Sequence, residues 1–186
     1  FPVRSERDRR SVDLVFSEDL FEWKRIGQIR IGGGPGEPVL FRSAPDTPKC
    51  VIRTEQPDDH SWIGESKAPY EDWTWTDLGV MIHAPVVLKV DDRWICAGRS
   101  KASHLPIDAI PEDPDGRHHH TSVWDITDHK AEHLLTFPSA GDCSYCGLAH
   151  GPDGEVVMSY YSQHERFPLP PERPTPSDIF IARFRL

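Results

Sequence analysis

Short runs of apolar residues, separated by glycine, proline and aspartate, recur along the whole chain. Most runs are four to eight residues long and rich in Val, Ile, Trp, Tyr and Phe, the composition typical of β-strands. Helical spacing of apolar positions is nearly absent. The pattern predicts an all-β fold with strands at residues 12–16, 24–29, 38–41, 50–53, 61–64, 73–78, 85–90, 94–97, 121–126, 132–137, 146–149, 156–161 and 178–185.

A two-strand unit is repeated three times. Its copies are GEPVLFRSAPDTPKCVIR (36–53), HAPVVLKVDDRWICAGR (83–99) and GDCSYCGLAHGPDGEVVMSYY (141–161). The first two copies end in arginine and the third in two tyrosines. The interval is 46 residues from Arg53 to Arg99, and tryptophans 23, 73 and 124 suggest a similar period.

Repeats of about 40–50 residues with four strands each are typical of β-propeller blades. We therefore predict one propeller portion over 1–186, with a partial blade at 1–34 and blades at 35–82, 83–140 and 141–186. Only outer strands of the first blade are visible, and a polar insertion at 101–120 delays the third copy. A self-contained β-sandwich is the alternative fold, but it does not explain the period.

About three and a half blades do not close a ring, because propellers have at least four. We therefore expect the missing N-terminal blades to belong to the same polypeptide, before Phe1. The chain starts without Met and without a signal peptide, as a processed product or part of a longer polypeptide would.

Composition narrows the classes of partner. The formal net charge of −9 argues against a nucleic-acid-binding surface. No apolar run approaches the length of a membrane span, which is about 18 residues. Cys50 and Cys96 occupy matching points of two copies, which predicts buried thiols.

Neither a metal nor another cofactor is predicted. The CSYC motif at 143–146 has redox spacing but lacks a βαβ context, and no second cysteine pair is present for zinc. The three consecutive histidines at 118–120 cannot all face one ion on a strand, so we expect them in a loop.

Several stretches together resemble the sialidase-like (BNR/Asp-box) β-propellers, in particular the bacterial proteins often labelled exo-α-sialidase-like. The matching pieces are GEPVLF, CVIRTE, WIGESKAPYEDWTWTDLG, APVVLKVDDRWICAGR, GDCSYCGLAHGPDGEVVMSYYSQHE and DIFIARFRL, over about four fifths of the chain. The Asp-box signature Ser-x-Asp-x-Gly-x-Thr-Trp is degraded. The stretch at 17–23 is one residue short and lacks the glycine, and the stretch at 66–73 has Ala68 and Tyr70 at the Asp and Gly positions.

The resemblance implies the C-terminal part of a six-bladed ring and a secreted or periplasmic protein. It also implies site residues: Tyr145 matches the family's nucleophilic Tyr, Glu37 its base, and Arg53 and Arg99 two arginines that bind the substrate carboxylate. Another arginine and an Asp general acid of the family would lie in blades before Phe1. The isolated chain is therefore expected to be inactive.

The chemistry fits these residue types. A sialic acid carries a carboxylate at its anomeric carbon, which repels an anionic nucleophile, so a neutral phenol with a carboxylate base is a workable alternative. Planar guanidinium groups bind the carboxylate bidentately. Asp142, beside Tyr145, is a candidate for orienting a sugar hydroxyl.

Structural roles are the alternative for each residue. Tyr145 can be a half-buried aromatic, Glu37 a turn residue, and the two arginines partners of Glu55 and Asp91. Tryptophans 62 and 94 and Tyr161 are candidates for an aromatic platform or for the core.

Three functions remain open at this point. The first is a glycoside hydrolase acting on glycans with a terminal acidic sugar. The second is a non-catalytic glycan- or protein-binding propeller module. The third is hydrolysis of a neutral or uronic glycan by a related propeller. In each glycan-directed case the partner is a carbohydrate.

Overall fold

The computed structural model describes residues 2–4, 11–44, 46–109, 119–166 and 176–186, for residues 2–4 the backbone only. The all-β prediction is confirmed, because each of the thirteen predicted segments overlaps a strand and the described helices are four 3-10 turns of three residues. The strands are β1 Pro2–Arg4, β2 Ser11–Phe16, β3 Lys24–Arg30, β4 Gly36–Ala44, β5 Thr47–Arg53, β6 Ser61–Ser66, β7 Trp73–Asp77, β8 His83–Val90, β9 Arg93–Lys101, β10 His119–Asp125, β11 Glu132–Phe137, β12 Ser144–His150, β13 Val156–Ser162 and β14 Asp178–Phe184. No described helix is long and apolar enough to cross a membrane.

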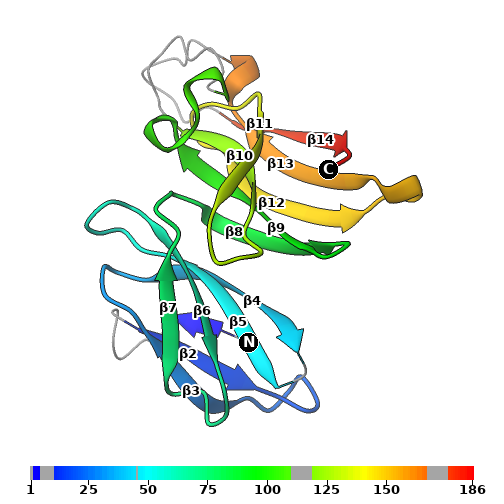
Figure 1. The fold of residues 1–186 in the computed structure, drawn as a ribbon. Coiled ribbons are helices and arrows are strands. Elements are labelled where there is room, and N and C mark those ends of the chain that lie inside the picture. The colour runs from blue at the N-terminus through cyan, green and yellow to red at the C-terminus, as the bar shows by residue number, and fades with distance from the viewer. Residues whose placement is uncertain (1, 5–10, 45, 110–118, 167–175) are drawn as a thin grey trace. The chain divides into compact units, whose positions relative to one another are not determined.

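The chain forms two compact units, 1–79 and 80–186. The first unit contains a three-stranded sheet, β1-β2-β3, and a four-stranded sheet, β4-β5-β6-β7 (Figure 1). All pairings between these strands are antiparallel. The core buries Val12 and Ile29 of the first sheet with Cys50 and Ile52 of the second. Apolar burial therefore holds the two sheets together.

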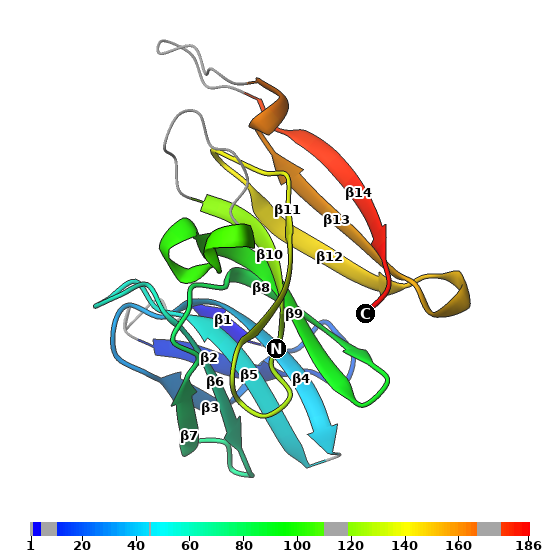
Figure 2. The ribbon, with the colours of Figure 1, turned by 45° about the horizontal axis from the view of Figure 1, so that its top comes forward.

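The second unit repeats this plan with a four-stranded sheet, β8-β9-β10-β11, and a three-stranded sheet, β12-β13-β14 (Figure 2). Ile95 and Val123 of the first of these sheets cluster with Val156 and Met158 of the second. Burial along β13 alternates strictly, with Val156, Met158 and Tyr160 buried. One face of this sheet thus supplies the core, and the other carries Tyr161.

The three sequence copies are also copies in structure. In each copy the first strand has one extra residue near its start, a β-bulge, so that three steps along the first strand match two steps along the second. The pairs that flank the bulge are Gly36↔Arg53 and Val39↔Val51 between β4 and β5, His83↔Arg99 and Val86↔Ala97 between β8 and β9, and Ser144↔Tyr161 and Gly147↔Ser159 between β12 and β13. The residue after the first pair has a left-handed backbone in all three: φ is 48° at Glu37, 50° at Ala84 and 40° at Tyr145. Glu37, Ala84 and Tyr145 are therefore equivalent, as are Arg53, Arg99 and Tyr161.

The tryptophan period is wrong in its second interval. Trp23 precedes β3 and Trp73 begins β7, the last strand of each sheet, but Trp124 lies within β10, the third strand of its sheet. The Trp124 indole is 2% exposed and donates to the Ser100 hydroxyl at 3.2 Å. Its position thus reflects packing and not the repeat.

Two turns retain a common geometry although the Asp-box signature is degraded. Leu20 (φ 68°) and Tyr70 (φ 67°) have left-handed backbones. Each accepts, through its carbonyl, the indole N–H of the tryptophan three residues later, Trp23 or Trp73, at 3.2 Å. Tyr70 stands at the position where the signature has glycine, the residue that adopts this conformation without strain.

We predict that Leu20→Gly stabilises the first unit. A left-handed backbone costs a non-glycine residue about 1 kcal/mol, and the Leu20 side chain is 75% exposed, so little packing is lost. Chemical denaturation followed by tryptophan fluorescence should show an increase of up to about 1 kcal/mol in the free energy of unfolding. Phe21→Gly is the control, because Phe21 is exposed but has a negative φ, and it should not stabilise. A loss of stability in Leu20→Gly would contradict the strain.

Candidate functional site

The predicted site residues lie where the first and second strands of the repeat meet. Glu37 and Arg53 belong to the first unit, and Arg99, Asp142 and Tyr145 to the second. Each unit brings its own residues together at the end of its sheets. That the site residues of both units form one binding site stays a prediction.

In the first unit, Arg53 is held between two carboxylates. Its Nη1 lies 3.2 Å from Glu37 Oε2, and its Nη2 donates to Glu55 Oε1 at 3.0 Å. Gly36, opposite Arg53 in the ladder, has no side chain, and a Cβ there would lie 3.3 Å from Arg53 Nε. The glycine thus leaves room for the guanidinium beside the bulge. The predicted Arg53–Glu55 pair is present, and it coexists with the contact to Glu37.

In the second unit, Arg99 fixes the start of β12. Its Nε and Nη2 donate to the Cys143 carbonyl at 2.8 and 2.6 Å, and Nη2 also donates to Asp142 Oδ1 at 2.8 Å. The carboxylate partner of Arg99 is therefore Asp142 and not Asp91. Because an arginine from β9 holds the backbone carbonyl next to the bulge, the position of the following residues depends on this charge.

Tyr161 belongs to the same network, although from the sequence it was a candidate only for an aromatic platform or the core. Its hydroxyl donates to Asp142 Oδ1 at 3.0 Å and accepts from Arg99 Nη2 at 3.2 Å. Burial, followed by the hydrogen bond and negative charge of Asp142, raises the pKa of Tyr161 to about 12, although Arg99 opposes the shift. The phenol therefore remains protonated at neutral pH. The sequence contained a signal for this role, because Tyr161 occupies the position in the repeat that Arg53 and Arg99 occupy in the other two copies.

Tyr145 is an exposed residue and not the half-buried aromatic that was the alternative. It is 60% exposed, and its ring stacks on that of Tyr161 with centroids 6.2 Å apart and planes at 14°. The Tyr145 backbone is left-handed and lies in the bulge. Such strained conformations persist only where the surrounding structure holds them, and they cluster at functional sites. The bulge thus leaves more than half of the Tyr145 residue exposed to solvent.

Trp62 and Trp94, the other two platform candidates, lie elsewhere. Trp62 packs against the core of the first unit, in agreement with the alternative that it is a core residue. The ring of Trp94 lies 5.8 Å from the ammonium group of Lys89. Tyr161 is thus the member of the three that joins the site.

Basic side chains line a pocket of about 760 Å³ beside Arg99. Lys101 is two residues further along β9, and His119 lies opposite Lys101 in the ladder with β10. Since side chains alternate along strands, the three basic groups share one face. Asp142 supplies the negative charge among the described lining residues. The pocket combines an arginine with hydrogen-bonding groups, an arrangement suited to an anionic, hydroxyl-rich ligand.

The histidine prediction is wrong for two of the three residues. His119 and His120 belong to β10, and His120 is fully buried with its Nδ1 2.9 Å from the Ser139 carbonyl. His118 lies outside the described residues. The physical reason is that the β9–β10 ladder extends to the pair His119↔Lys101.

The cysteines have the chemistry of buried thiols. Cys50 and Cys96 are fully buried, and burial raises the pKa of both thiols far above their usual range. Burial also raises the pKa of Cys143, and that of Cys146 to about 12. All four are free, and the described residues contain no group of three or more His, Cys, Asp or Glu able to hold a metal ion.

Comparison with known proteins supports the fold and leaves the activity open. No protein-family model and no curated protein matches the chain. A solved structure of a protein of unknown function from Dyadobacter fermentans is similar over 93% of this chain and 45% of its own, with a TM-score of 0.63 and 19% identity.

A second solved structure is that of an α-L-arabinofuranosidase from Fusarium graminearum, a mutant in complex with an iminosugar inhibitor. It is similar over 93% of this chain and 53% of its own, with a TM-score of 0.58 and 13% identity. The chain thus spans about half the length of both proteins. At these identities the likeness concerns the fold alone.

We predict that Asp142→Asn lowers the pKa of Tyr161. The substitution removes the negative charge that disfavours the phenolate, whereas Arg99 remains. Ultraviolet titration of the tyrosines should show one phenol ionising at lower pH than in the unchanged protein. Asp153→Asn, in a turn of the same unit, is the control and should leave the titration unchanged. An unaltered curve for Asp142→Asn would assign the shift to burial alone.

We predict that the thiols are inert in the folded chain. Because a thiolate is the reactive form, the raised pKa of Cys146 and the burial of the other three should suppress reaction with a disulfide reagent at neutral pH. Four thiols should react after denaturation. Rapid modification of the folded protein would contradict this, and Cys146→Ser would show whether Cys146 is responsible.

Proposed function

We propose that the chain is part of a sialidase-like β-propeller glycoside hydrolase that acts on glycans with a terminal acidic sugar. The observation that carries this proposal is the equivalence of Glu37 and Tyr145. Each occupies the left-handed position of a β-bulge at the start of the first strand in its sheet. The proposal assigns the role of base to the Glu37 carboxylate and the role of nucleophile to the Tyr145 phenol.

The repeat of antiparallel sheets supports the propeller part of the proposal. The third and fourth strands of one sheet, β6 and β7, have counterparts in β2 and β3, because the Trp23 and Trp73 turns match. In this proposal the sheets are blades, and the remaining blades and the general acid come from the rest of the polypeptide.

The proposed reaction begins with attack of the Tyr145 oxygen on the anomeric carbon. Its proton passes to Glu37 while the glycosidic bond breaks, and the general acid protonates the leaving oxygen. Water then attacks the anomeric carbon and gives a proton to the conjugate base of the general acid, while Glu37 returns its proton to the departing Tyr145 oxygen. Arg53 and Arg99 bind the substrate carboxylate, and Asp142 orients a hydroxyl. The fixed geometry of Arg99, with its bonds to the Cys143 carbonyl, supports this binding role.

A non-catalytic glycan-binding module is the second candidate. The specific observation in its favour is the exposed Tyr145 residue, whose ring stacks nearly parallel on Tyr161 close to the pocket lined by Arg99 and Asp142. Sugars bind to exposed aromatic faces next to hydrogen-bonding groups without any need for a nucleophile.

Two substitutions of Tyr145 test the function. In the full-length polypeptide, Tyr145→Phe keeps the ring and removes the nucleophile, so kcat on a fluorogenic α-sialoside should fall by about a thousandfold or more. Binding of free N-acetylneuraminic acid should change little, whereas Tyr145→Ala should weaken it. Unchanged turnover in Tyr145→Phe would remove Tyr145 from the mechanism.

A panel of substrates separates the remaining alternatives. A β-glucuronide and an α-L-arabinofuranoside should be turned over far more slowly than the sialoside, and the reverse order would favour a uronic or neutral substrate. Binding without hydrolysis of any of them would favour the binding module. The 186-residue chain alone should not turn over the sialoside, and turnover by it would contradict the assignment of the general acid to other blades.

A further inference from the structure

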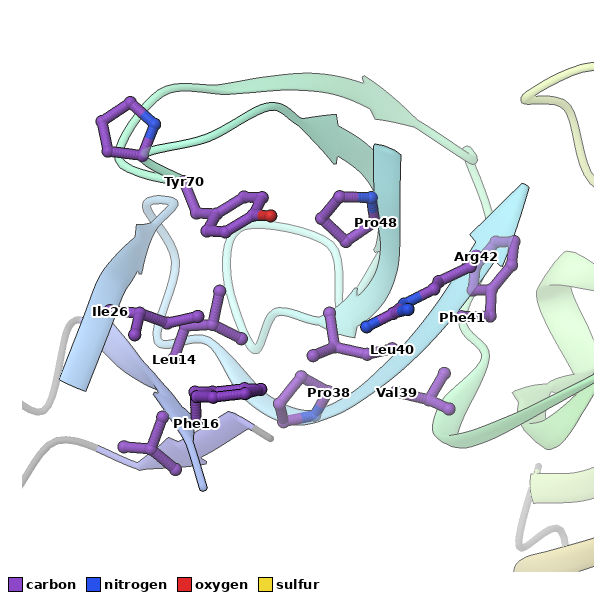
Figure 3. A pocket seen from close by; sticks show the side chains of 12 residues that line it. Leu14, Phe16, Ile26, Pro38, Val39, Leu40, Phe41, Arg42, Pro48 and Tyr70 are labelled. Carbon is purple, nitrogen blue, oxygen red and sulfur yellow. The ribbon is translucent and has the colours of Figure 1, made fainter. Parts of the chain in front are cut away.

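The first unit contains an apolar pocket of about 880 Å³ that takes no part in the proposed hydrolysis. One wall is formed by Leu14 and Phe16 at the end of β2, and another by Pro38 and Leu40 on β4 (Figure 3). Phe16 is 48% exposed, so this wall offers apolar surface to solvent. The volume and the lining are typical of a site for a small molecule with an apolar body.

Arg42 is the charged residue among the described residues that line this pocket. Alternation along β4 puts it on the same face as Pro38 and Leu40. Figure 3 shows its guanidinium group turned toward the pocket. Within the described part of the chain Arg42 has neither an ion pair nor a hydrogen bond from its side chain, in contrast to Arg53 and Arg99. Its charge is therefore available to a ligand.

Tyr70 adds a second polar group to the same pocket. Its ring borders the pocket with the hydroxyl directed inward (Figure 3). The residue is held in a left-handed conformation against β3, where a Cβ on Gly27 would lie only 2.5 Å from the Tyr70 carbonyl oxygen. Glycine at position 70 would avoid the strain but would leave this wall without an aromatic ring or a donor.

We propose that this pocket binds an amphipathic carboxylate, a small molecule with an alkyl or aryl body and one carboxylate group. The apolar walls remove the body from water, and Arg42 binds the carboxylate with a charge-assisted hydrogen bond supplemented by Tyr70. A cationic or neutral head group would leave the guanidinium unpaired. Because Arg42 is the charged residue among the described lining residues, the preference for an anionic head group depends on this arginine.

Calorimetric titration of the full-length protein with decanoate, decanol and decylamine tests the proposal. Decanoate should bind at one site, about tenfold more tightly than the other two. Arg42→Gln should remove most of that preference while leaving the binding of decanol unchanged. Phe16→Ala should weaken all three about tenfold, because it removes apolar surface. Phe21→Ala, which truncates a phenylalanine that is 89% exposed and does not line the pocket, should have no effect.

Three results would overturn the proposal. The first is no binding of decanoate by a folded full-length protein. The second is equal binding of the three probes in both the unchanged protein and Arg42→Gln, which would show nonspecific adsorption. The third is an effect of Phe21→Ala as large as that of Phe16→Ala. Turnover of the sialoside is measured separately, so failure here does not depend on the proposed hydrolysis.

Discussion

The β-bulge between the first and second strands is the constraint on which the candidate site depends. In three sheets, one extra residue lies between paired positions of the antiparallel ladder, and the residue after the first pair must adopt a left-handed backbone. No glycine occupies these positions. Each of them therefore carries strain of about 1 kcal/mol, which the surrounding ladder has to support. In return, the bulge turns one side chain out of the regular alternation at the end of the sheet.

What supports the bulge differs between the copies, and so does its chemistry. In the first unit, Arg53 contacts the bulge residue Glu37 itself, at 3.2 Å. In the second unit, Arg99 holds the backbone at Cys143, and Tyr161 replaces arginine as the partner of the bulge strand. Ala84 has neither charge nor ring. All three copies thus share the same bulged backbone. The residue at the bulge decides whether that position carries a carboxylate, as in Glu37, a phenol, as in Tyr145, or only a methyl group, as in Ala84.

Most of the fold was accessible from the sequence because strand formation is local. Alternating apolar residues between Gly, Pro and Asp predicted each of the thirteen strand segments, and the copies at 36–53, 83–99 and 141–161 predicted their equivalence. The errors came from patterns whose cause is not local. Trp124 matched the tryptophan spacing by coincidence, because its burial against Ser100 fixes it in a different strand. His120 looked like a loop residue, and the length of the β9–β10 ladder puts it in the core.

The sequence by itself determined the strands, the repeat and the equivalence of the arginines, since these depend on periodicity and on residue type. It also named Glu37, Arg53, Arg99, Asp142 and Tyr145 as candidates. Only the tertiary structure decided which of them touch. It joined Arg53 to Glu37, and Arg99 to Asp142, Cys143 and Tyr161, residues more than forty positions away in the chain. It also showed the left-handed backbones, because the register between strands, which local propensity does not encode, creates the bulges.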